Sequence, residues 1–290
     1  MKNDQRYKDS LASKKTLKRN ADTLFLLSPS DIGVRRNRGR NGARFAPKVI
    51  LNQFLKLNDH LDSVKEIRCI PTTSKEIEEI NFEESQKTQS QKILNELNED
   101  PKNIIHIGGG HDHVFPFLKA VQSSKKYKNI FIVNIDAHCD TRVDTSSHSG
   151  TPFRDFDKSI ADERDLKVTL YQYGIQEQAN SKSTLQSLKY IEQRITTVQE
   201  ELKLNFDSFN EDSFILLSLD ADGLDSSIMK AVSAVNPYGV KQSSVVSIIQ
   251  KIKLSKAQSA FGIYEYNPIY DDLSNQGARV ISHLIYNWLK

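Results

Sequence analysis

The chain has 290 residues, of which 38% are hydrophobic, so it can bury the core of one large domain or two small ones. Its 40 basic and 37 acidic residues nearly balance, and this composition gives no indication of a polyanionic partner. Two cysteines are too few for a disulfide framework, and neither a secretory signal nor an apolar run of about 18 residues is evident, so we expect a cytoplasmic protein without membrane contact.

The chain begins with a polar stretch. Residues 1–20 are rich in Lys, Arg and Asp, and we predict an N-terminal arm that has little to bury. Residues 21–290 contain no internal repeat and no Pro- or Gly-rich linker, so they are predicted to form a single domain.

Within this domain, short apolar runs alternate with longer stretches of helical pattern. Eight runs are predicted strands, at residues 23–27, 66–70, 104–107, 130–135, 168–174, 194–197, 214–219 and 259–265. The predicted helices include residues 47–57, 76–97, 114–123, 242–254 and 274–289. This alternation predicts an α/β fold of three layers, in which a mainly parallel eight-stranded sheet is covered by helices on both faces.

Polar residues stand at or just after the ends of four predicted strands. These residues are Gly108, Asp136, Asp220 and Glu265. In folds of this kind, ligands bind in the crevice beyond the carboxyl ends of the strands. We therefore expect the polar groups to converge at one edge of the sheet.

The segment from Asp136 to Asp140 carries the strongest signal. Side chains alternate in an extended segment, so Asp136, His138 and Asp140 are predicted to point to one side. Cys139 is predicted to point away from them and to pack like an apolar residue. Two carboxylates and an imidazole suit a divalent cation. The alternative is a hydrogen-bonded strand end with a capping Asp, although clustered carboxylates without compensation are costly in a semi-buried place.

A second pair of carboxylates, Asp220 and Asp222, follows the apolar run at residues 214–217. The two are expected to share one direction, and like charges this close raise each other's pKa unless a cation lies beside them. A lone Asp-x-Asp is often a turn or a solvated cap. Its position after a buried strand favours the metal-binding interpretation.

The glycine run at residues 108–110 lets the backbone approach a ligand closely. Such turns also hold phosphates, but no Gly-Lys-Ser/Thr sequence follows, which argues against a nucleotide loop. His111 is the predicted metal ligand, because His106 lies inside the apolar strand and His113 is expected at a helix surface or beside the ligands. Glu265 precedes a Pro-containing loop and is predicted either to bind a cationic substrate group or to pair with a nearby Arg.

Taken in chain order, these four segments resemble motifs of the ureohydrolase family, which contains arginase, agmatinase and formimidoylglutamase. The shared motifs are Gly-Gly-x-His, Asp-Ala-His-x-Asp, Ser-x-Asp-x-Asp-x-x-Asp and Glu-x-Asn-Pro, within residues 108–268. The resemblance implies an arginase-like catalytic domain at residues 21–290 and a homo-oligomer, either a trimer or a hexamer. It also implies two Mn²⁺ ions per subunit, held by His111, Asp136, His138, Asp140, Asp220 and Asp222.

The resemblance further implies a hydroxide that bridges the two metal ions and attacks the substrate. Asp140 is the expected catalytic acceptor of a hydrogen bond from that hydroxide. Glu265 is expected to hold the amidine or guanidine nitrogens of the substrate. Both roles are transferred by analogy with the family.

Two flanking segments, residues 30–43 and 149–154, are most similar to formimidoylglutamases. Agmatinase-like members usually carry a His where this chain has Ser149, and here the His is displaced to His148. The implied reaction is cleavage of N-formimidoyl-L-glutamate to L-glutamate and formamide in histidine degradation. Arginine binds carboxylates bidentately, so the substrate's two carboxylates are expected to contact residues among Arg142, Ser149, Arg154, Arg35, Arg36 and Arg40.

Three alternatives remain open from the sequence. The first is another ureohydrolase, such as an arginase, an agmatinase or a guanidino-acid hydrolase. The second is a binding protein that keeps the fold without catalysis. A third is nucleic-acid binding through the arginine-rich residues 35–44, but that stretch lacks aromatic partners other than Phe45, and we expect no nucleic-acid partner. Residues 226–235 depart from the family pattern by lacking its Pro and Gly, so no substrate contact is transferred there.

Overall fold

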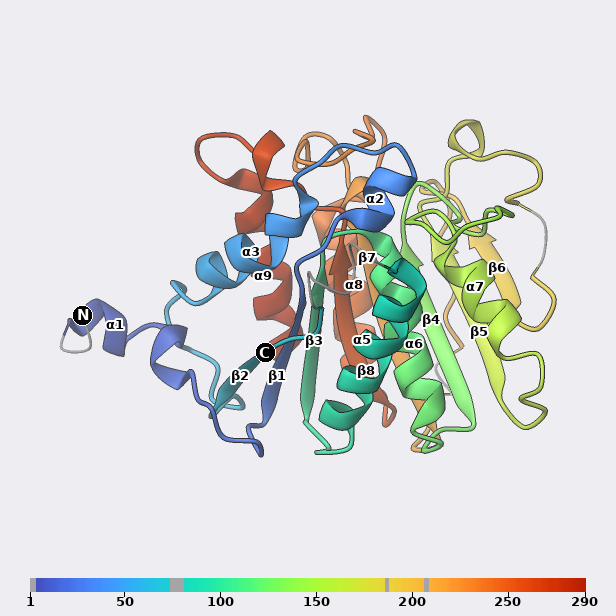
Figure 1. Ribbon diagram of the computed structural model, residues 1–290. Coiled ribbons are helices and arrows are strands. Elements are labelled where there is room, and N and C mark those ends of the chain that lie inside the picture. Colours follow the sequence, from blue (N-terminus) through green and yellow to red (C-terminus); the bar gives the residue numbers. More distant parts are fainter. Residues whose placement is uncertain (1–3, 74–80, 186–187, 206–208) are drawn as a thin grey trace.

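Eight parallel strands form one central sheet in the computed structural model, which describes residues 4–73, 81–185, 188–205 and 209–290 (Figure 1). Every neighbouring pair runs parallel, in the order β2-β1-β3-β8-β7-β4-β5-β6, which confirms the predicted fold class. The strands are β1 (Thr23–Ser28), β2 (Ile67–Pro71), β3 (Asn103–Gly108), β4 (Asn129–Ile135), β5 (Lys167–Tyr173), β6 (Glu192–Thr196), β7 (Ser213–Asp220) and β8 (Gln258–Tyr264).

Helices cover both faces of the sheet, and a separate apolar core lies under each set. β3 and β7 are buried along their whole length, which explains why most of their residues are apolar. The first core contains residues of α3 (Ala46–Phe54), α8 (Gln242–Lys253) and α9 (Gln276–Leu289). The second contains residues of α5 (Phe82–Leu97), α6 (Val114–Ser123) and α7 (Pro152–Ser159).

The predicted helices correspond to α3, α5, α6, α8 and α9. The first residues of the predicted helix 76–97, up to residue 80, lie outside the described residues, and α5 begins after Asn81, whose Oδ1 accepts a hydrogen bond from Glu84 N at 3.0 Å. Two helices near the site were not predicted. These are α2 (Ile32–Arg36), which is one turn long and contains a glycine, and α7, which starts at Pro152.

The N-terminal arm packs against the rest of the chain more than expected. It contains α1 (Gln5–Lys8) and the short helix η1 (Leu11–Lys14), and the Leu11 side chain is fully buried. The amides of Leu11 and Ala12 donate to the carbonyls of Leu57 and Leu55, both at 3.0 Å. In the part of the chain that the structure describes, no helix combines the length and hydropathy needed to cross a bilayer.

The four strands that end in polar residues are neighbours. β3, β8, β7 and β4 lie next to one another in the middle of the sheet, so the loops that follow them meet at one edge. The predicted convergence therefore follows from the strand order, although these strands are far apart in the chain.

We predict that Ile281→Ala lowers the free energy of unfolding by about 2–5 kcal/mol, because Ile281 is fully buried where α9 packs on the sheet. Denaturant unfolding of the two proteins measures the difference. His283→Ala, at an exposed position of the same helix, is the control and should change stability by less than about 0.5 kcal/mol. Equal effects of the two substitutions would contradict the packing described for α9.

Candidate metal centre and substrate pocket

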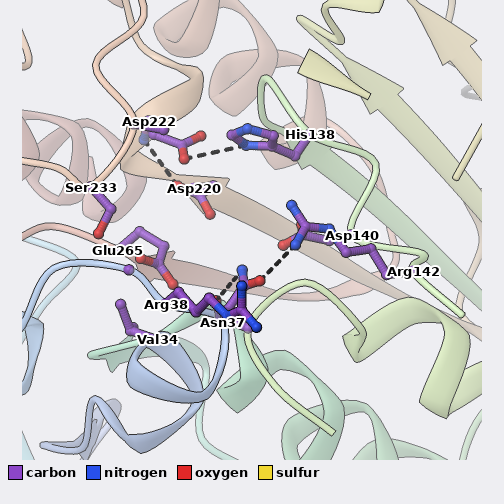
Figure 2. A pocket seen from close by; sticks show the side chains of 13 residues that line it. Val34, Asn37, Arg38, His138, Asp140, Arg142, Asp220, Asp222, Ser233 and Glu265 are labelled. Carbon is purple, nitrogen blue, oxygen red and sulfur yellow. Dashed lines mark hydrogen bonds and ion pairs between the residues drawn. The ribbon is translucent and has the colours of Figure 1, made fainter. Parts of the chain in front are cut away.

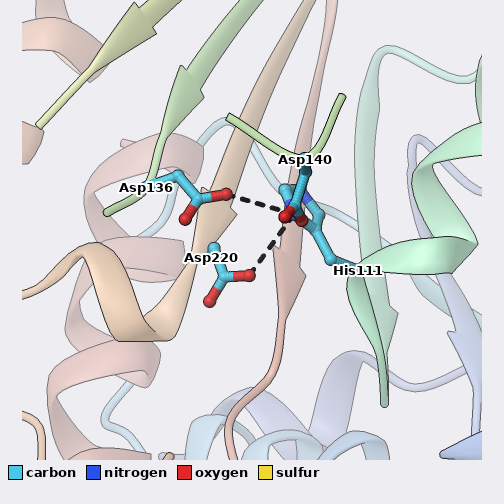
Figure 3. A group of neighbouring side chains, drawn as sticks. All are labelled: His111, Asp136, Asp140 and Asp220. Atoms are coloured by element: carbon cyan, nitrogen blue, oxygen red, sulfur yellow. Dashed lines mark hydrogen bonds and ion pairs between the residues drawn. The ribbon is translucent and has the colours of Figure 1, made fainter. Parts of the chain in front are cut away.

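One buried cluster contains His111, Asp136, Asp140 and Asp220, whose candidate ligand atoms all lie within 4.8 Å of one another (Figure 3). His111 Nδ1 lies 2.7 Å from Asp140 Oδ2, and 3.3 Å from both Asp136 Oδ2 and Asp220 Oδ2. These residues follow β3 and β4 or end β7. The arrangement can surround a single cation.

A second cluster contains Asp136, His138 and Asp222. His138 Nδ1 lies 3.3 Å from Asp222 Oδ2 and 3.5 Å from Asp136 Oδ1. Asp136 belongs to both clusters and faces each with a different carboxylate oxygen. The structure thus brings all six predicted ligands together as two adjoining groups.

The backbone conformation that brings these ligands together differs from the predicted one. β4 ends at Ile135, and residues 136–140 form a loop rather than an extended strand. Asp140 has a left-handed backbone (φ 50°). The expectation of an extended segment with alternating side chains is therefore wrong, although the three side chains do converge: Asp136 belongs to both clusters, and His138 and Asp140 line the same pocket.

Asp220 and Asp222 belong to different clusters, because the short helix η6 (Ala221–Gly223) turns the chain between them. Asp220 Oδ1 accepts a hydrogen bond from Asp222 N at 2.9 Å, which stabilises this turn. A Cβ on Gly223 would lie 2.6 Å from the Cα of Asp136. The glycine therefore allows the two ligand-bearing loops to approach closely.

His111 follows the glycine run, at the start of the short helix η3 (His111–His113). Its amide donates to Glu265 Oε1 at 3.0 Å, and Glu265 N donates to the Gly109 carbonyl at 2.8 Å, so the loops after β3 and β8 hold each other. His106 lies inside β3, as predicted. His113 is buried rather than at a helix surface, and its Nδ1 lies 2.9 Å from Gln89 Oε1.

The charges of the two clusters do not balance without a cation. Burial raises the pKa of Asp220 and Asp222, and the mutual repulsion of these carboxylates raises the pKa of Asp220 further. The charge of Asp222 raises the pKa of His138 to about 12. Burial lowers the pKa of His111, but its hydrogen bonds to Asp136 and Asp140 outweigh this effect and raise it to about 10. Bound protons thus supply positive charge that a metal ion can replace.

Asp222 Oδ1 is buried without a hydrogen-bond partner, which leaves an acceptor directed to no described protein donor. A site of carboxylate oxygens and two imidazoles suits Mn²⁺, and also accepts Co²⁺ or Zn²⁺. The residues present therefore fit two divalent cations that share Asp136. Cys139 is buried and, among the described residues, belongs to neither cluster.

A pocket of about 240 Å³ opens onto the clusters (Figure 2). Its inner wall contains His138, Asp140, Asp220, Asp222 and Glu265. Glu265 is buried, which raises its pKa to about 8, and its backbone is left-handed (φ 61°). The remaining lining residues are Val34, Asn37, Arg38, Gly39, Arg142, Ser149, Ser233 and Ala234.

The predicted substrate-binding residues separate into two groups. Arg142 and Ser149 line the pocket, whereas the others do not belong to its lining and have different partners. Arg154 Nε donates to the Thr141 carbonyl at 3.2 Å. In the first loop, Arg35 lies 3.5 Å from Asp31, Arg36 lies 2.8 Å from Glu83, and Arg40 donates to the Val232 carbonyl at 3.3 Å.

Arg38 lines the pocket although it is not among the predicted substrate-binding residues. Its backbone is left-handed (φ 62°), directly before Gly39. Helices often end in a left-handed residue before a glycine, but α2 itself was not predicted, so the Arg-Gly pair did not identify this turn.

Two other segments differ from expectation. Ser233 and Ala234, from the atypical residues 226–235, line the pocket, and Ser233 Oγ accepts a hydrogen bond from Arg40 N at 2.9 Å. His148 is buried and does not line the pocket; its Nε2 lies 3.2 Å from Asp144 Oδ2. The neighbouring Ser149 is therefore the residue of this turn that faces the pocket.

Several known proteins are similar to this chain in sequence or in fold. A formimidoylglutamase of Staphylococcus haemolyticus is 29% identical over 269 residues, covering 89% of this chain and 83% of that protein. One from Klebsiella pneumoniae is 26% identical over 279 residues, covering 91% and 84%. A crystal structure of Trypanosoma cruzi formiminoglutamase with Mn²⁺ superposes with a TM-score of 0.80 at 21% identity, covering 97% of each chain.

A putative agmatinase from Clostridium difficile superposes with a TM-score of 0.73 at 22% identity, covering 92% of this chain and 95% of that one. At such identities, the structural likenesses show the fold. The sequence model of the Arginase family matches residues 21–290, nearly the whole chain. The chain therefore belongs to the Arginase family.

Proposed function

We propose that this chain is a binuclear manganese hydrolase that cleaves N-formimidoyl-L-glutamate to L-glutamate and formamide. Water adds to the amidine carbon, and the bond from that carbon to the glutamate nitrogen breaks. The observation that carries the proposal is one pocket lined both by residues of the two clusters of metal-ligand type and by Arg38 and Arg142 (Figure 2). The names of the relatives, at 26–29% identity, support the same substrate.

His111, Asp136, Asp140 and Asp220 would hold one Mn²⁺ ion, and Asp136, His138 and Asp222 the other. Two such ions supply Lewis-acid chemistry that lowers the pKa of water and generates a nucleophile at neutral pH. The carboxylates and imidazoles of this chain fix where that chemistry occurs. Asp140, at the boundary between the clusters and the pocket, is the proposed acceptor of a hydrogen bond from the attacking group.

Glu265 is the proposed anchor for the amidine nitrogens. Its Oε1 is already occupied by the amide of His111, which orients the carboxyl group toward the pocket that it lines. Amidines are cationic at neutral pH and present parallel N–H donors, so a carboxylate is a suitable partner. The positive charge of a bound amidine and two metal ions favours the ionised form of Glu265.

Arg142 and Ser149 are the proposed partners for the substrate's carboxylates. An agmatinase reaction fits less well, because agmatine ends in an ammonium group that the positive charge of Arg142 repels. The assembly as a trimer or hexamer and the cytoplasmic location stay predictions, as does the separation of residues 1–20 from a single catalytic domain.

A substrate panel tests the proposed function. With Mn²⁺, the purified protein is expected to release formamide from N-formimidoyl-L-glutamate and to release little urea from arginine, agmatine or guanidinobutyrate. If urea release dominates, the proposed substrate is wrong and the chain has another ureohydrolase activity. Inertness toward every substrate, with Mn²⁺ bound, would favour the non-catalytic alternative.

We predict that Asp140→Asn loses Mn²⁺ and activity together, because the amide replaces a charged ligand in the first cluster. Asn also tolerates the left-handed backbone at this position, so the fold should be retained. Elemental analysis and circular dichroism measure the two effects. Asp144→Asn, an exposed carboxylate outside both clusters, is the control and should keep the metal content. Full turnover by Asp140→Asn would refute the ligand assignment.

We also predict that Mn²⁺ binding releases protons. His111 and His138, with pKa values raised to about 10 and about 12, carry protons near neutral pH in the metal-free protein, and a nitrogen that binds a metal cannot keep its proton. Affinity should therefore rise as the pH increases from about 6 to about 9. Titration calorimetry in two buffers of different ionisation enthalpy measures this release. Heats that do not depend on the buffer would contradict it.

A further inference from the structure

Two arginines of the pocket lack acidic partners. The Arg142 guanidinium donates to the side-chain amide of Asn37, and the Arg38 guanidinium has no hydrogen bond or ion pair among the described residues. Three other arginines of the same loop are each paired with a carboxylate: Arg35, Arg36 and Arg44. Arg40 of this loop pairs with no carboxylate either, but its guanidinium donates to the Val232 carbonyl and stacks on Tyr270, and it does not belong to the pocket lining. Arg38 is therefore the arginine of this loop that lines the pocket without an acidic partner among the described residues.

The backbone explains why Arg38 differs from its neighbours. α2 ends at Arg36, and the chain then turns through Arg38, whose amide donates to the Arg35 carbonyl at 3.0 Å. Gly39 N donates to the Val34 carbonyl at 2.8 Å, and a Cβ on Gly39 would lie 2.6 Å from Val34 Cγ1. This tight, left-handed turn takes the Arg38 side chain away from the direction of the helix and places it at the pocket.

Arg142 is held in place by Asn37. Asn37 Oδ1 accepts from Arg142 Nη1 at 2.6 Å, while Asn37 Nδ2 donates to Ser149 Oγ at 3.1 Å. With both ends of the amide used, its orientation is fixed. A Cβ on Gly150 would lie 3.2 Å from Arg142 Nε, so the arginine side chain lies directly against the Gly150 backbone. The guanidinium is therefore positioned before a ligand arrives.

We propose that Arg38 and Arg142 together form the acceptor for an anionic substrate tail, and that Asn37 is a positioning residue for Arg142. Guanidinium groups bind carboxylates through paired, charge-assisted hydrogen bonds. In Figure 2, Asn37 and Arg38 lie on the opposite side of the pocket from His138 and Asp222. A ligand that spans it places a cationic amidine near the carboxylates and its anionic tail near the arginines.

This inference rests on the proposed function and assigns the residues that hold the two carboxylates of its substrate. Two guanidinium groups can pair with two carboxylates, whereas one carboxylate would leave a cation unpaired. We therefore expect a dicarboxylate to bind more tightly than a matched monocarboxylate such as N-formimidoylglycine. An amidine with a neutral alkyl tail should bind most weakly.

The test compares Arg38→Met and Arg142→Met with wild type on these three amidines. Each variant should lower kcat/KM for N-formimidoyl-L-glutamate by about tenfold to a hundredfold, mainly through KM, because each loses a charge-assisted hydrogen bond. The preference for the dicarboxylate over the neutral amidine, as the ratio of their kcat/KM values, should fall by the same factor, and the Mn²⁺ content should stay that of wild type. Arg44→Met is the matched control, since Arg44 belongs to the same loop but pairs with Asp31 outside the pocket lining.

The role of Asn37 is tested by a double-mutant cycle. Asn37→Ala should raise KM for the dicarboxylate in wild type but have no further effect in Arg142→Met, because the residue acts through that arginine. An equal effect of Asn37→Ala in both backgrounds would refute its positioning role. Unchanged KM in Arg38→Met and Arg142→Met would refute the acceptor itself.

Binding of L-glutamate, measured by calorimetry, separates failure of this inference from failure of the proposed function. The ligand occupies the tail acceptor without requiring turnover, and its affinity should fall in Arg38→Met and Arg142→Met. If wild type binds L-glutamate in this way but cleaves no amidine, the proposed function fails and the acceptor stands. If wild type cleaves the substrate and the variants bind L-glutamate as tightly as wild type, the acceptor alone fails.

Discussion

Electrostatic repulsion among buried carboxylates is the constraint on which the arrangement of this site depends. Asp136, Asp140, Asp220, Asp222 and Glu265 are buried at one edge of the sheet. Their negative charges can be kept close together only when positive charge lies between them, because burial removes the screening by water. The two histidines provide part of this charge when protonated, and divalent cations provide it more effectively. The fold therefore makes a cation-binding site by placing acidic groups where they cannot be solvated.

The parallel sheet makes this convergence possible. The carboxyl ends of its four central strands lie side by side, although the polar residues at these ends are spread between positions 108 and 265 of the chain. The loop that carries Arg38 follows β1, which pairs with β3. Loops from the same sheet therefore carry both Arg38 and the two clusters of candidate metal ligands. Hydrogen bonds between loops, such as the one from His111 N to Glu265, then fix their relative positions.

The strands, and the residues that gather in the two clusters, were predictable from the sequence, because strands buried on both faces are mostly apolar and polar residues stand out at their ends. The sequence could not predict the shape of the loops. The segment 136–140 was interpreted as extended, whereas a left-handed Asp140 distributes its side chains between two clusters. Likewise, the choice of Arg38 over Arg35 and Arg36 depends on a turn and on acidic partners elsewhere in the chain, such as Glu83.

Asp140 and Glu265 share the unusual feature of a left-handed backbone at a residue that is not glycine. This conformation costs roughly 1–2 kcal/mol for an ordinary L-residue, and less for Asp. Glu265 is held there by the hydrogen bond from its amide to the Gly109 carbonyl, at 2.8 Å. Glycine would relieve this cost and remove the carboxylate in the same step. Selection for heat resistance alone would therefore draw both positions away from their chemistry, so their acidic side chains persist only while activity is also selected.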